Sequence, residues 1–421
     1  MANSYLTNNM ITFEMLRVLS NNVIAASKVT RTYDKQFAKT GAKIGQVIQV
    51  RKPPRYFVSD GATFVAQDYA EEMVPLTVDQ HKQVGCEFGN DDLTLNMDDF
   101  SGRVLKPSLV PLANAVDSFI MADYYNIYNA TGTPGTTAAT DTPFLLARNI
   151  LFNNAAFMTD DMPMLLTGRS SVLLSSGLSN RLNPAQEISE LYRKGGMGGE
   201  MKKSMGHALG WNMYEDQNMP VHVTGAWALN ASNATVTTAG QIGASILTTG
   251  WAATITGLGK KGDSIQFAGV YSVNPVSYAS TGELMNFALT ADVNSDGSYN
   301  ATLPITPPIV VAGKGQNVSN SPAAGAIITV WDTAVVANVA SKTSPQNMGW
   351  QNEAITLACV DLMVPEEGEG VKAIRVADDD LGLSFVYMRG FDPRVYSRVA
   401  RIDILFGKQF LRPEHVVRVA N

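Results

Sequence analysis

The sequence has few charged residues for its length and no excess of positive charge. Charged side chains make up 17% of 421 residues, against about a quarter in an average protein, while 45% of residues are hydrophobic. Disordered chains combine low hydrophobicity with high charge, so this composition excludes disorder and favours a folded chain of two to four domains. Thirty-two basic and 38 acidic residues give a net charge of −6. The chain is therefore a poor candidate for a dedicated duplex-DNA-binding protein, which relies on many Lys and Arg contacts to phosphate.

Cysteines and long apolar runs are also scarce. Cys86 and Cys359 are too few and too far apart for a disulfide framework or a zinc site, so we expect two reduced thiols. No run of about 18 apolar residues could span a membrane, so no membrane partner is expected. Residues 1–9 are polar and lack the basic start and apolar stretch of a signal peptide. We therefore expect synthesis and use in the cytoplasm.

The sequence offers no catalytic constellation. The only histidines are His81, His207, His222 and His415, and none stands at metal-ligand spacing from another ligand, so ordinary surface or half-buried roles are favoured. Residues 168–171 lack the second glycine of a nucleophile elbow, and residues 313–315 lack the spacing of a phosphate-binding loop. The expectation is a protein that is not an enzyme, with no catalytic residue, no cofactor and no resident metal.

Two acidic stretches leave a choice of interpretation. Asp292, Asn294 and Asp296 match the first half of a calcium-binding loop, but the twelfth position is Leu303 where a bidentate glutamate is required. A hairpin turn and a surface calcium site therefore both stay open, with the turn favoured. Residues 366–369 (Glu-Glu-Gly-Glu) suit a solvated loop better than an acid–base pair.

The first hundred residues read as a helix followed by a long β excursion. Leu16, Leu19 and Val23 recur at helical spacing and predict an amphipathic helix over residues 10–28. Residues 43–95 are rich in strand-forming residues and are interrupted by a Pro-Pro pair at 53–54. A two-stranded excursion is poorly stable alone and needs another surface to lie on.

A cluster of basic residues marks this excursion. Arg51, Lys52 and Arg55 are consistent with two roles: charges that protect an edge strand from aggregation, or charges that pair with a neighbouring subunit. Together with Leu16, Leu19 and Val23, they are the candidate subunit-interface residues.

The middle and end of the chain mix helices and strands. An apolar stripe with a period of 3.6 predicts a helix over 108–129 with Ser108 as its N-cap, and Thr142 and Pro143 predict the start of a second helix over 143–158. A shorter helix is expected to begin at Asn183. Strands are predicted at residues 355–364, 382–391, 401–407 and 415–419.

The composition changes sharply near residue 225. From 226 to 343 the chain is rich in Ala, Thr, Ser, Gly and Asn, and helical patterns largely vanish. Short β segments at 264–270, 284–290 and 327–330 are separated by turn signals such as residues 261–263. The pattern predicts an inserted all-β module of roughly 120 residues in a chain of overall α+β class.

Several stretches together resemble one known family, the phage P22 coat protein family. The resemblance covers most of the chain and is strongest from about 205 to 421, where it is carried by Gly210–Gly225, Lys260–Val270, Phe287–Asp292, Asp296–Ser298, Gly382–Phe385, Arg401–Gly407 and Leu411–Glu414. The resemblance implies the Hong Kong 97-like capsid fold. On that basis residues 1–42 are an N-terminal arm and 43–95 an extended β loop overlying a neighbour. Residues 96–225 hold the peripheral domain with its spine helix and part of the axial domain, 226–343 an inserted β-barrel, and 344–421 the remainder of both domains.

The same resemblance implies a function and partners. The chain is expected to be a major capsid protein whose copies form pentamers and hexamers of an icosahedral virion shell around the double-stranded DNA of a tailed phage. A scaffolding protein and a portal protein are expected partners in the bacterial cytoplasm, with a decoration protein as an optional one and the DNA contacted weakly and non-specifically. Residues 228–249 are short and low in charge where the family's type member has a loop crossing two-fold axes, which favours support of the subunit's own folding as the role of the insertion.

Two other function classes remain open from the sequence. The first is an encapsulin-like shell protein without DNA, built on the same fold. The second is a glycan-binding surface protein, suggested by the Thr-, Asn- and Ser-rich β module.

Overall fold

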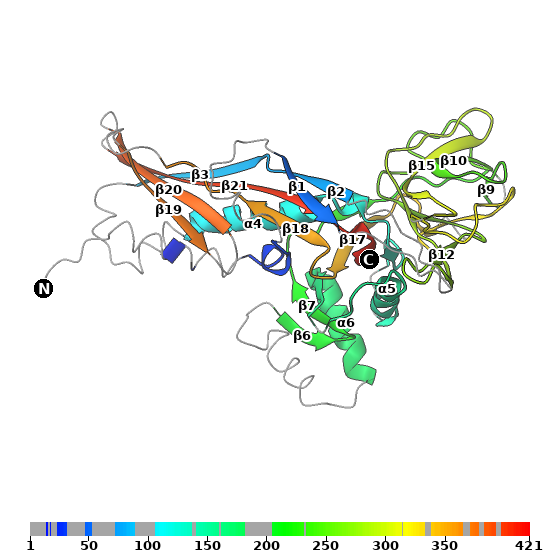
Figure 1. The fold of residues 1–421 in the computed structure, drawn as a ribbon, viewed down its shortest axis with the longest axis horizontal. Coiled ribbons are helices and arrows are strands. Elements are labelled where there is room, and N and C mark those ends of the chain that lie inside the picture. Colours follow the sequence, from blue (N-terminus) through cyan, green and yellow to red (C-terminus); the bar gives the residue numbers. More distant parts are fainter. Residues whose placement is uncertain are drawn as a thin grey trace, which may run out of the picture. The chain divides into compact units, whose positions relative to one another are not determined.

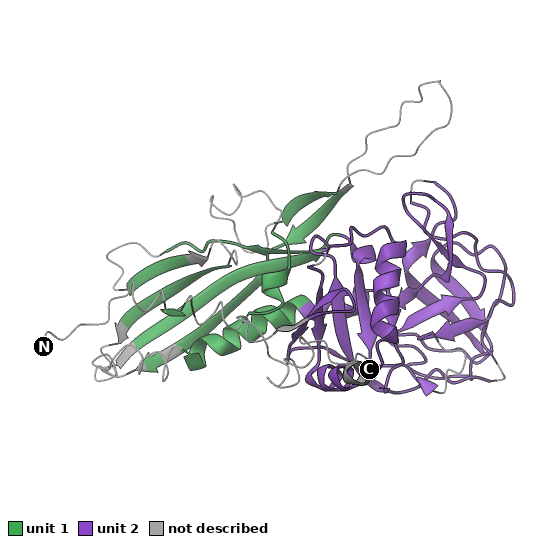
Figure 2. Ribbon diagram, turned by 90° about the horizontal axis from the view of Figure 1, so that it is seen from below, with its two compact units in different colours: residues 1–52, 71–120, 355–411 green, residues 53–70, 121–354, 412–421 purple. Residues whose placement is uncertain are grey.

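The structure is a computed structural model with a mixed helix and strand architecture, which confirms the α+β class (Figure 1). The chain forms two compact units (Figure 2). Unit 1 contains residues 1–52, 71–120 and 355–411, and unit 2 contains 53–70, 121–354 and 412–421. The structure describes residues 14, 15, 17, 23–31, 47–52, 72–88, 106–136, 140–159, 161–181, 204–230, 233–313, 315–332, 338–364, 371–378, 383–392 and 397–421.

A five-stranded antiparallel sheet forms the centre of unit 1. Its strands are β18 (Ile355–Cys359), β21 (Ser397–Phe410), β20 (Leu383–Asp392) and β19 (Val371–Asp378) in that order, with β3 (Gln80–Phe88) also paired to β21. The apolar alternation at residues 402, 404 and 406 correctly indicated a strand, and all three side chains are fully buried. β3 lies in the range predicted for the extended loop, yet residues 80–88 pair along residues 398–406 of this sheet.

A two-stranded hairpin packs onto this sheet in unit 1. β1 (Val47–Lys52) and β2 (Glu72–Thr77) pair antiparallel, with Val47 opposite Thr77 and Lys52 opposite Glu72. The inward face of the hairpin joins a buried cluster that contains Ile48, Val50, Leu76, Val78, Ala358, Val360, Leu405 and Leu411. A hairpin that would be marginal alone is thus stabilised at its base by burial of one face.

The long helix of unit 1 is shorter than the sequence predicted. α4 spans Lys106–Ala122, so Ser108 lies inside the first turn and the N-cap assignment was wrong. The predicted end at residue 129 was also wrong, because Tyr124–Asn126 form a 3-10 turn. Lys408 donates from Nζ to the carbonyl oxygens of Phe119 and Ile120, which satisfies acceptors that the end of the helix leaves open.

The described part of the N-terminal segment is fastened to α4. Residues 14, 15 and 17 are helical, but residues 26–28 form a 3-10 turn (η1, Ala26–Lys28), so the helix predicted through residue 28 stops earlier. The buried Asp117 carboxylate accepts hydrogen bonds from the backbone N–H groups of Ile24 and Ala26 at 2.8 and 3.0 Å. This side-chain cap supports the short turn in place of a longer helix.

Unit 2 is built first on a mixed seven-stranded sheet. Its strand order is β4 (Ala130–Thr131), β22 (Val416–Ala420), β17 (Thr343–Trp350), β5 (Pro163–Leu166), β7 (Trp211–Glu215) and β6 (Ser204–Ala208), with β8 (Val221–Val223) beside β17. α6 spans Gly168–Arg181 and α5 spans Thr142–Asn153. α5 begins one residue earlier than predicted, after Asp141, and ends before residue 158 because Ala155 adopts a left-handed backbone (φ 56°).

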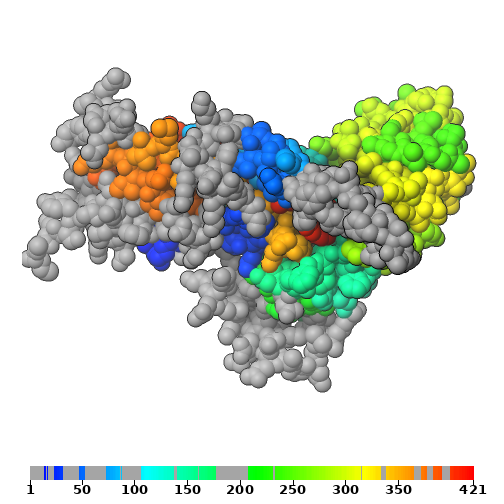
Figure 3. Space-filling model, in the orientation of Figure 1, coloured from blue at the N-terminus to red at the C-terminus, as the bar shows by residue number. Residues whose placement is uncertain are grey.

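The second element of unit 2 is the inserted β domain. Six strands follow the order β16 (Ile328–Val330), β11 (Ser264–Phe267), β14 (Phe287–Leu289), β15 (Asn300–Ile309), β10 (Gly243–Thr249) and β9 (Thr235–Val236). The sheet nearly closes, because Thr235 bridges Ile327 and Val236 donates its N–H to the Ala326 carbonyl. A separate hairpin joins β12 (Tyr271–Val273) and β13 (Ser280–Leu284). In the space-filling view these green-to-yellow residues gather into one body (Figure 3).

The core of the inserted domain is continuous with the rest of unit 2. Its buried cluster contains Trp227, Trp251, Phe267 and Phe287, and it also includes Tyr128, Ala130 and Ala420 from outside the insertion. A second cluster lies under α5 and includes Phe144, Leu151, Trp211 and Val417. The insertion and its parent therefore share apolar burial and do not have wholly separate cores.

Candidate functional site: the buried junction of the inserted domain

Asp263 in unit 2 immediately precedes β11 and is a fully buried carboxylate with several hydrogen-bond partners. Its Oδ2 accepts hydrogen bonds from the backbone N–H groups of Gly225 and Lys260 at 2.9 and 2.8 Å, and from Trp227 Nε1 at 2.9 Å. Its Oδ1 contacts His222 Nε2 at 2.8 Å and Trp331 Nε1 at 3.3 Å. Charge-assisted bonds of this kind are the strong ones in proteins, so one carboxylate fastens both ends of the insertion.

His222 extends this network into the parent fold. It lies on β8, is 2% exposed, and its Nδ1 is 3.2 Å from the Tyr124 hydroxyl. One consistent arrangement has Tyr124 donating to Nδ1 and Nε2–H donating to Asp263, which uses every polar atom of the imidazole. The Tyr124 ring also packs edge-on against the imidazole, 5.7 Å between centroids. Burial is the main cause that raises the pKa of Tyr124, so its hydroxyl stays protonated near neutral pH.

The positive charge at this junction comes from the C-terminal strand. Arg418, on β22, is fully buried and donates from Nη2 to the Gly262 carbonyl oxygen. Its guanidinium lies 4.7 Å from the centre of the Trp331 ring, a cation–π contact. Burial lowers the pKa of Arg418 to about 10, and the nearby Asp263 carboxylate opposes that shift. Arg418 is thus charged at neutral pH in a position without access to water.

Two glycines allow the chain segments to approach one another here. A Cβ on Gly225 would lie 2.3 Å from the Leu258 carbonyl oxygen, which leaves no room for a side chain. Gly262 has φ +94°, and a Cβ there would lie 2.8 Å from Cβ of Tyr125. Both positions need glycine, the second also because of its left-handed backbone.

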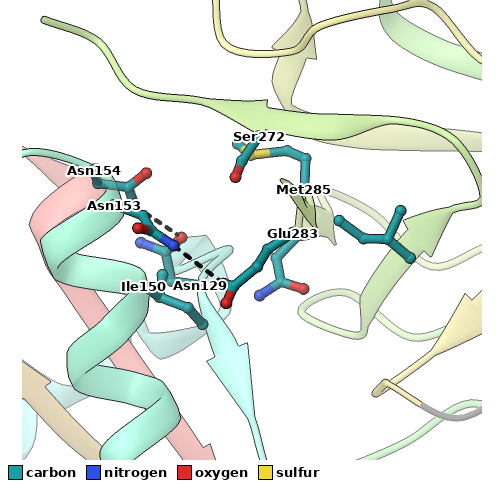
Figure 4. Close-up of a pocket in the computed structure, with 9 residues that line it drawn as sticks. Asn129, Ile150, Asn153, Asn154, Ser272, Glu283 and Met285 are labelled. Atoms are coloured by element: carbon teal, nitrogen blue, oxygen red, sulfur yellow. Dashed lines mark hydrogen bonds between the residues drawn. The ribbon is translucent and has the colours of Figure 1, made fainter. Parts of the chain in front are cut away.

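A small cavity lies between α5 and the β12–β13 hairpin (Figure 4). Glu283 accepts hydrogen bonds from Asn149 Nδ2 at 2.6 Å and Asn153 Nδ2 at 3.1 Å, and Asn274 donates to the Asn153 carbonyl oxygen. The cavity has a volume of about 20 Å³, which is space for about one water. It is a second polar contact between the insertion and its parent, and it is too small for an organic ligand.

The candidate calcium residues take part in ordinary turn contacts. Asp292 accepts from Lys260 Nζ at 2.7 Å, Asn294 from the Gly257 N–H, and Asp296 from the N–H groups of Ser298 and Asn300. These bonds lower the pKa values of both aspartates, that from Lys260 being the largest contribution at Asp292 and that from the Asn300 N–H the largest at Asp296. Throughout the described ranges, no group of three His, Cys, Asp or Glu side chains is placed to hold a metal ion.

The remaining single residues sit in structural environments. His81 contacts Asp403 at 2.9 Å, His207 contacts Asn212 at 3.1 Å, and His415 contacts the Asn154 carbonyl oxygen at 3.3 Å. Burial raises the pKa of the Cys359 thiol to about 11, which disfavours the reactive thiolate. None of the helices in the described part of the chain is long and apolar enough to cross a membrane.

Three of the six predicted interface residues lie in the described part of the chain. Val23 is buried within unit 1 at 5% exposure, while Arg51 lies on the exposed face of β1 and Lys52 is half-buried. Leu16, Leu19, Arg55 and residues 183–199 and 366–369 lie outside the described residues. The interface assignments therefore stay predictions.

Sequence reasoning missed the Asp263 junction. The stretch 261–263 was read as a turn, and the left-handed Gly262 agrees with that reading, but four of the five partners described for Asp263 lie 36 to 68 positions away along the chain. Arg418 stands in a short apolar strand where a charged residue normally points to solvent. A single arginine in an otherwise apolar final strand was the available signal.

Comparison with known proteins gives one family match. Residues 218–418 match the family model described as "P22 coat protein - gene protein 5". Among curated proteins, none matches the sequence.

The solved structures that the chain resembles include phage capsids and a virus-like particle from Pyrococcus furiosus. One from Mycobacterium phage Che8 is 12% identical over 94% of this chain and 90% of that chain, with a TM-score of 0.44. The mature capsid of bacteriophage PhiM1 is 9% identical over 94% and 86%, with a TM-score of 0.39. The CUS-3 coat protein I-domain is 22% identical over 25% of this chain and 99% of that chain, with a TM-score of 0.18.

Proposed function

We propose that this chain, whose residues 218–418 match the P22 coat protein family model, is a phage major capsid protein and that its copies assemble as pentamers and hexamers of an icosahedral shell around double-stranded DNA. The coat-family match carries this proposal and favours it over a DNA-free encapsulin-like shell or a glycan-binding surface protein. The assigned role is structural and not catalytic. The chain would have the Hong Kong 97-like arrangement, with the ranges 1–42, 43–95, 96–225, 226–343 and 344–421 as its parts.

Exposed apolar side chains support a role in assembly. Phe152, Phe157, Val276 and Met363 have exposed fractions of 65, 77, 74 and 87%. Large apolar groups left open on a subunit are typical of surfaces that a partner covers. Stable interfaces between obligate partners bury about 2,000 Å² or more in total, which a shell subunit reaches by using several such surfaces.

Further partners belong to the same proposal. A scaffolding protein and a portal protein would guide assembly in the bacterial cytoplasm, and packaged DNA would meet an inner surface with only weak, non-specific attraction. The net charge of −6 supports weak contact, because strong phosphate binding requires clustered Lys and Arg.

Electron microscopy of the overexpressed chain tests the proposal. We expect closed shells or curved polymers in negative stain, with uniform closed particles when the neighbouring phage genes are co-expressed. A chain that stays monomeric in every condition, including co-expression, would contradict the proposal. Shells that never take up DNA in an infected cell would favour the encapsulin-like alternative.

We further propose that the inserted domain, residues 226–343, supports the folding of its own subunit. The shared buried cluster and the Asp263 network support this role, because both join the insertion to residues of the parent fold.

Deletion of residues 226–343 with a short linker should expose Tyr128, Ala130 and Ala420 and leave Arg418 without its partners. We expect retained helix content by circular dichroism but a loss of most soluble subunit and of assembly. Wild-type yield and normal shells from the deletion variant would contradict the support role and assign the insertion to surface decoration.

A further inference from the structure

The parent fold carries a buried positive charge on its last strand, and the insertion supplies what surrounds that charge. Arg418 lies within β22, between β4 and β17, and is fully buried. Taking a guanidinium out of water is costly unless hydrogen bonds and an opposite charge compensate it. The groups that compensate the Arg418 charge therefore decide whether β22 is stable in its buried position.

The compensation comes from the inserted domain, far away in sequence. The acceptor of the Arg418 hydrogen bond is the carbonyl of Gly262, 156 positions earlier. The guanidinium lies over the Trp331 ring, whose N–H donates to the Asp263 carboxylate, and Asp263, the residue after Gly262, is an opposite charge that acts on Arg418. Nε and Nη1 of Arg418 have no hydrogen-bond partner among the described residues, so these three insertion groups provide its main stabilisation.

Asp263 is in place only when the insertion is folded. Its carboxylate accepts hydrogen bonds from the N–H groups of Gly225 and Lys260 and from the Trp227 indole. These bonds require residues 225–227 to lie beside residues 260–263. Trp331 must then return from the end of β16 to complete the site. An unfolded insertion would deprive Arg418 of the Asp263 carboxylate.

We infer that Asp263 and Arg418 form an electrostatic lock through which the C-terminal strand β22 is seated only against a folded insertion. The inference deepens the proposed support role of the insertion and rests on it.

A double-mutant cycle in the full-length chain tests the lock. The single variants are Asp263→Asn and Arg418→Met, and the double variant carries both. Asp263→Asn leaves Arg418 buried without its counter-charge and should raise the equilibrium constant of unfolding by about 100-fold or more. Because Arg418→Met removes the stranded charge, the double variant should be at least about tenfold less destabilised than the sum of the two single effects.

Two matched controls separate the lock from general destabilisation. Ile246→Ala opens a cavity in the inserted core, since Ile246 is fully buried, but it leaves both charges in place. Arg418→Met should not offset the Ile246→Ala loss. Asp292→Asn removes the exposed pair with Lys260 and should change unfolding by no more than about fivefold.

The measurements are urea denaturation and hydrogen exchange of the β22 amides, with the assembly state of the variants matched by sedimentation. In Asp263→Asn the β22 amides should lose about 100-fold protection, and the double variant should regain much of it. If a single variant is insoluble, recovery of soluble protein by Arg418→Met, in the Asp263→Asn background only, supports the lock.

Three outcomes would overturn the lock: additive effects in the double-mutant cycle, equal effects of Arg418→Met in both backgrounds, or an insoluble double variant. Each of these outcomes would leave shell formation untouched, because micrographs of the wild-type chain test that separately. Failure of the support role would appear instead as normal yield from the deletion variant.

Discussion

Replacing Trp227 with alanine should destabilise the chain by about 3–5 kcal/mol, the usual cost of truncating a buried aromatic side chain to alanine. Trp227 is 1% exposed, and its ring centre lies 5.3 Å from that of Trp251 in the core of the insertion. Its indole N–H also donates to Asp263, so the substitution removes packing and a bond to a buried carboxylate together. Urea denaturation of the full chain measures the loss, and shell yield should fall with it.

Trp227→Phe separates the two contributions. Phenylalanine keeps most of the apolar volume but cannot donate to Asp263, so we expect a loss of about 1.5–3 kcal/mol, typical of a hydrogen bond to a charged group. Val276→Ala is the control, because that side chain is 74% exposed in the same domain and should change stability by no more than about 0.5 kcal/mol. If the free energy of unfolding of Trp227→Ala were within about 1 kcal/mol of wild type, the core of the insertion would not depend on this residue, because neighbouring side chains would fill the space it leaves.

Much of the strand content was predictable, because residues that favour strands and residues that favour turns are local signals. The strand predicted at residues 401–407 lies within β21, and the composition change near 225 located the start of the inserted strands. Turn residues such as Gly262 were equally informative, because a left-handed backbone is a local property. These features depend on a few neighbouring residues and are therefore visible in a single sequence.

Helix ends were less predictable, because contacts distant in sequence decide them. The apolar stripe of α4 continues past Ala122, but the helix ends where Lys408 reaches the carbonyl groups of Phe119 and Ile120. Near the N-terminus, Asp117 caps a short turn through the N–H groups of Ile24 and Ala26. In both cases the deciding side chain comes from a segment about 90 or more positions away.

The junction was not predictable for a related reason. A buried carboxylate is stable only when enough donors converge on it, and the donors of Asp263 come from β8, from the start of the insertion and from its end. The sequence shows none of these distances. An alternating pattern would instead place Arg418 on a solvent-facing side of its strand, whereas every residue of β22 is buried.

Replacing Gly407 with alanine should be nearly as damaging in unit 1 as the loss of Trp227 is in unit 2. A Cβ at position 407 would lie 2.1 Å from the Thr77 carbonyl oxygen and 2.8 Å from Cα of Val78. Both are backbone atoms at the end of the β1–β2 hairpin, so the clash is relieved only by moving the hairpin base off β21. We expect a loss of about 3 kcal/mol, the upper part of the range for overpacking, measured by denaturation.

Gly390→Ala in the adjacent strand β20 is the matched control for Gly407→Ala. Its added Cβ would lie 3.8 Å from methyl groups of Val371 and Val399, which is ordinary contact, so stability should stay unchanged or rise by up to about 1 kcal/mol. The hairpin leads into the range predicted to overlie a neighbouring subunit, so Gly407→Ala should also lower the yield of closed particles in negative stain, and Gly390→Ala should not. Equal stability and equal particle yield in the two variants would contradict a close backbone crossing at Gly407.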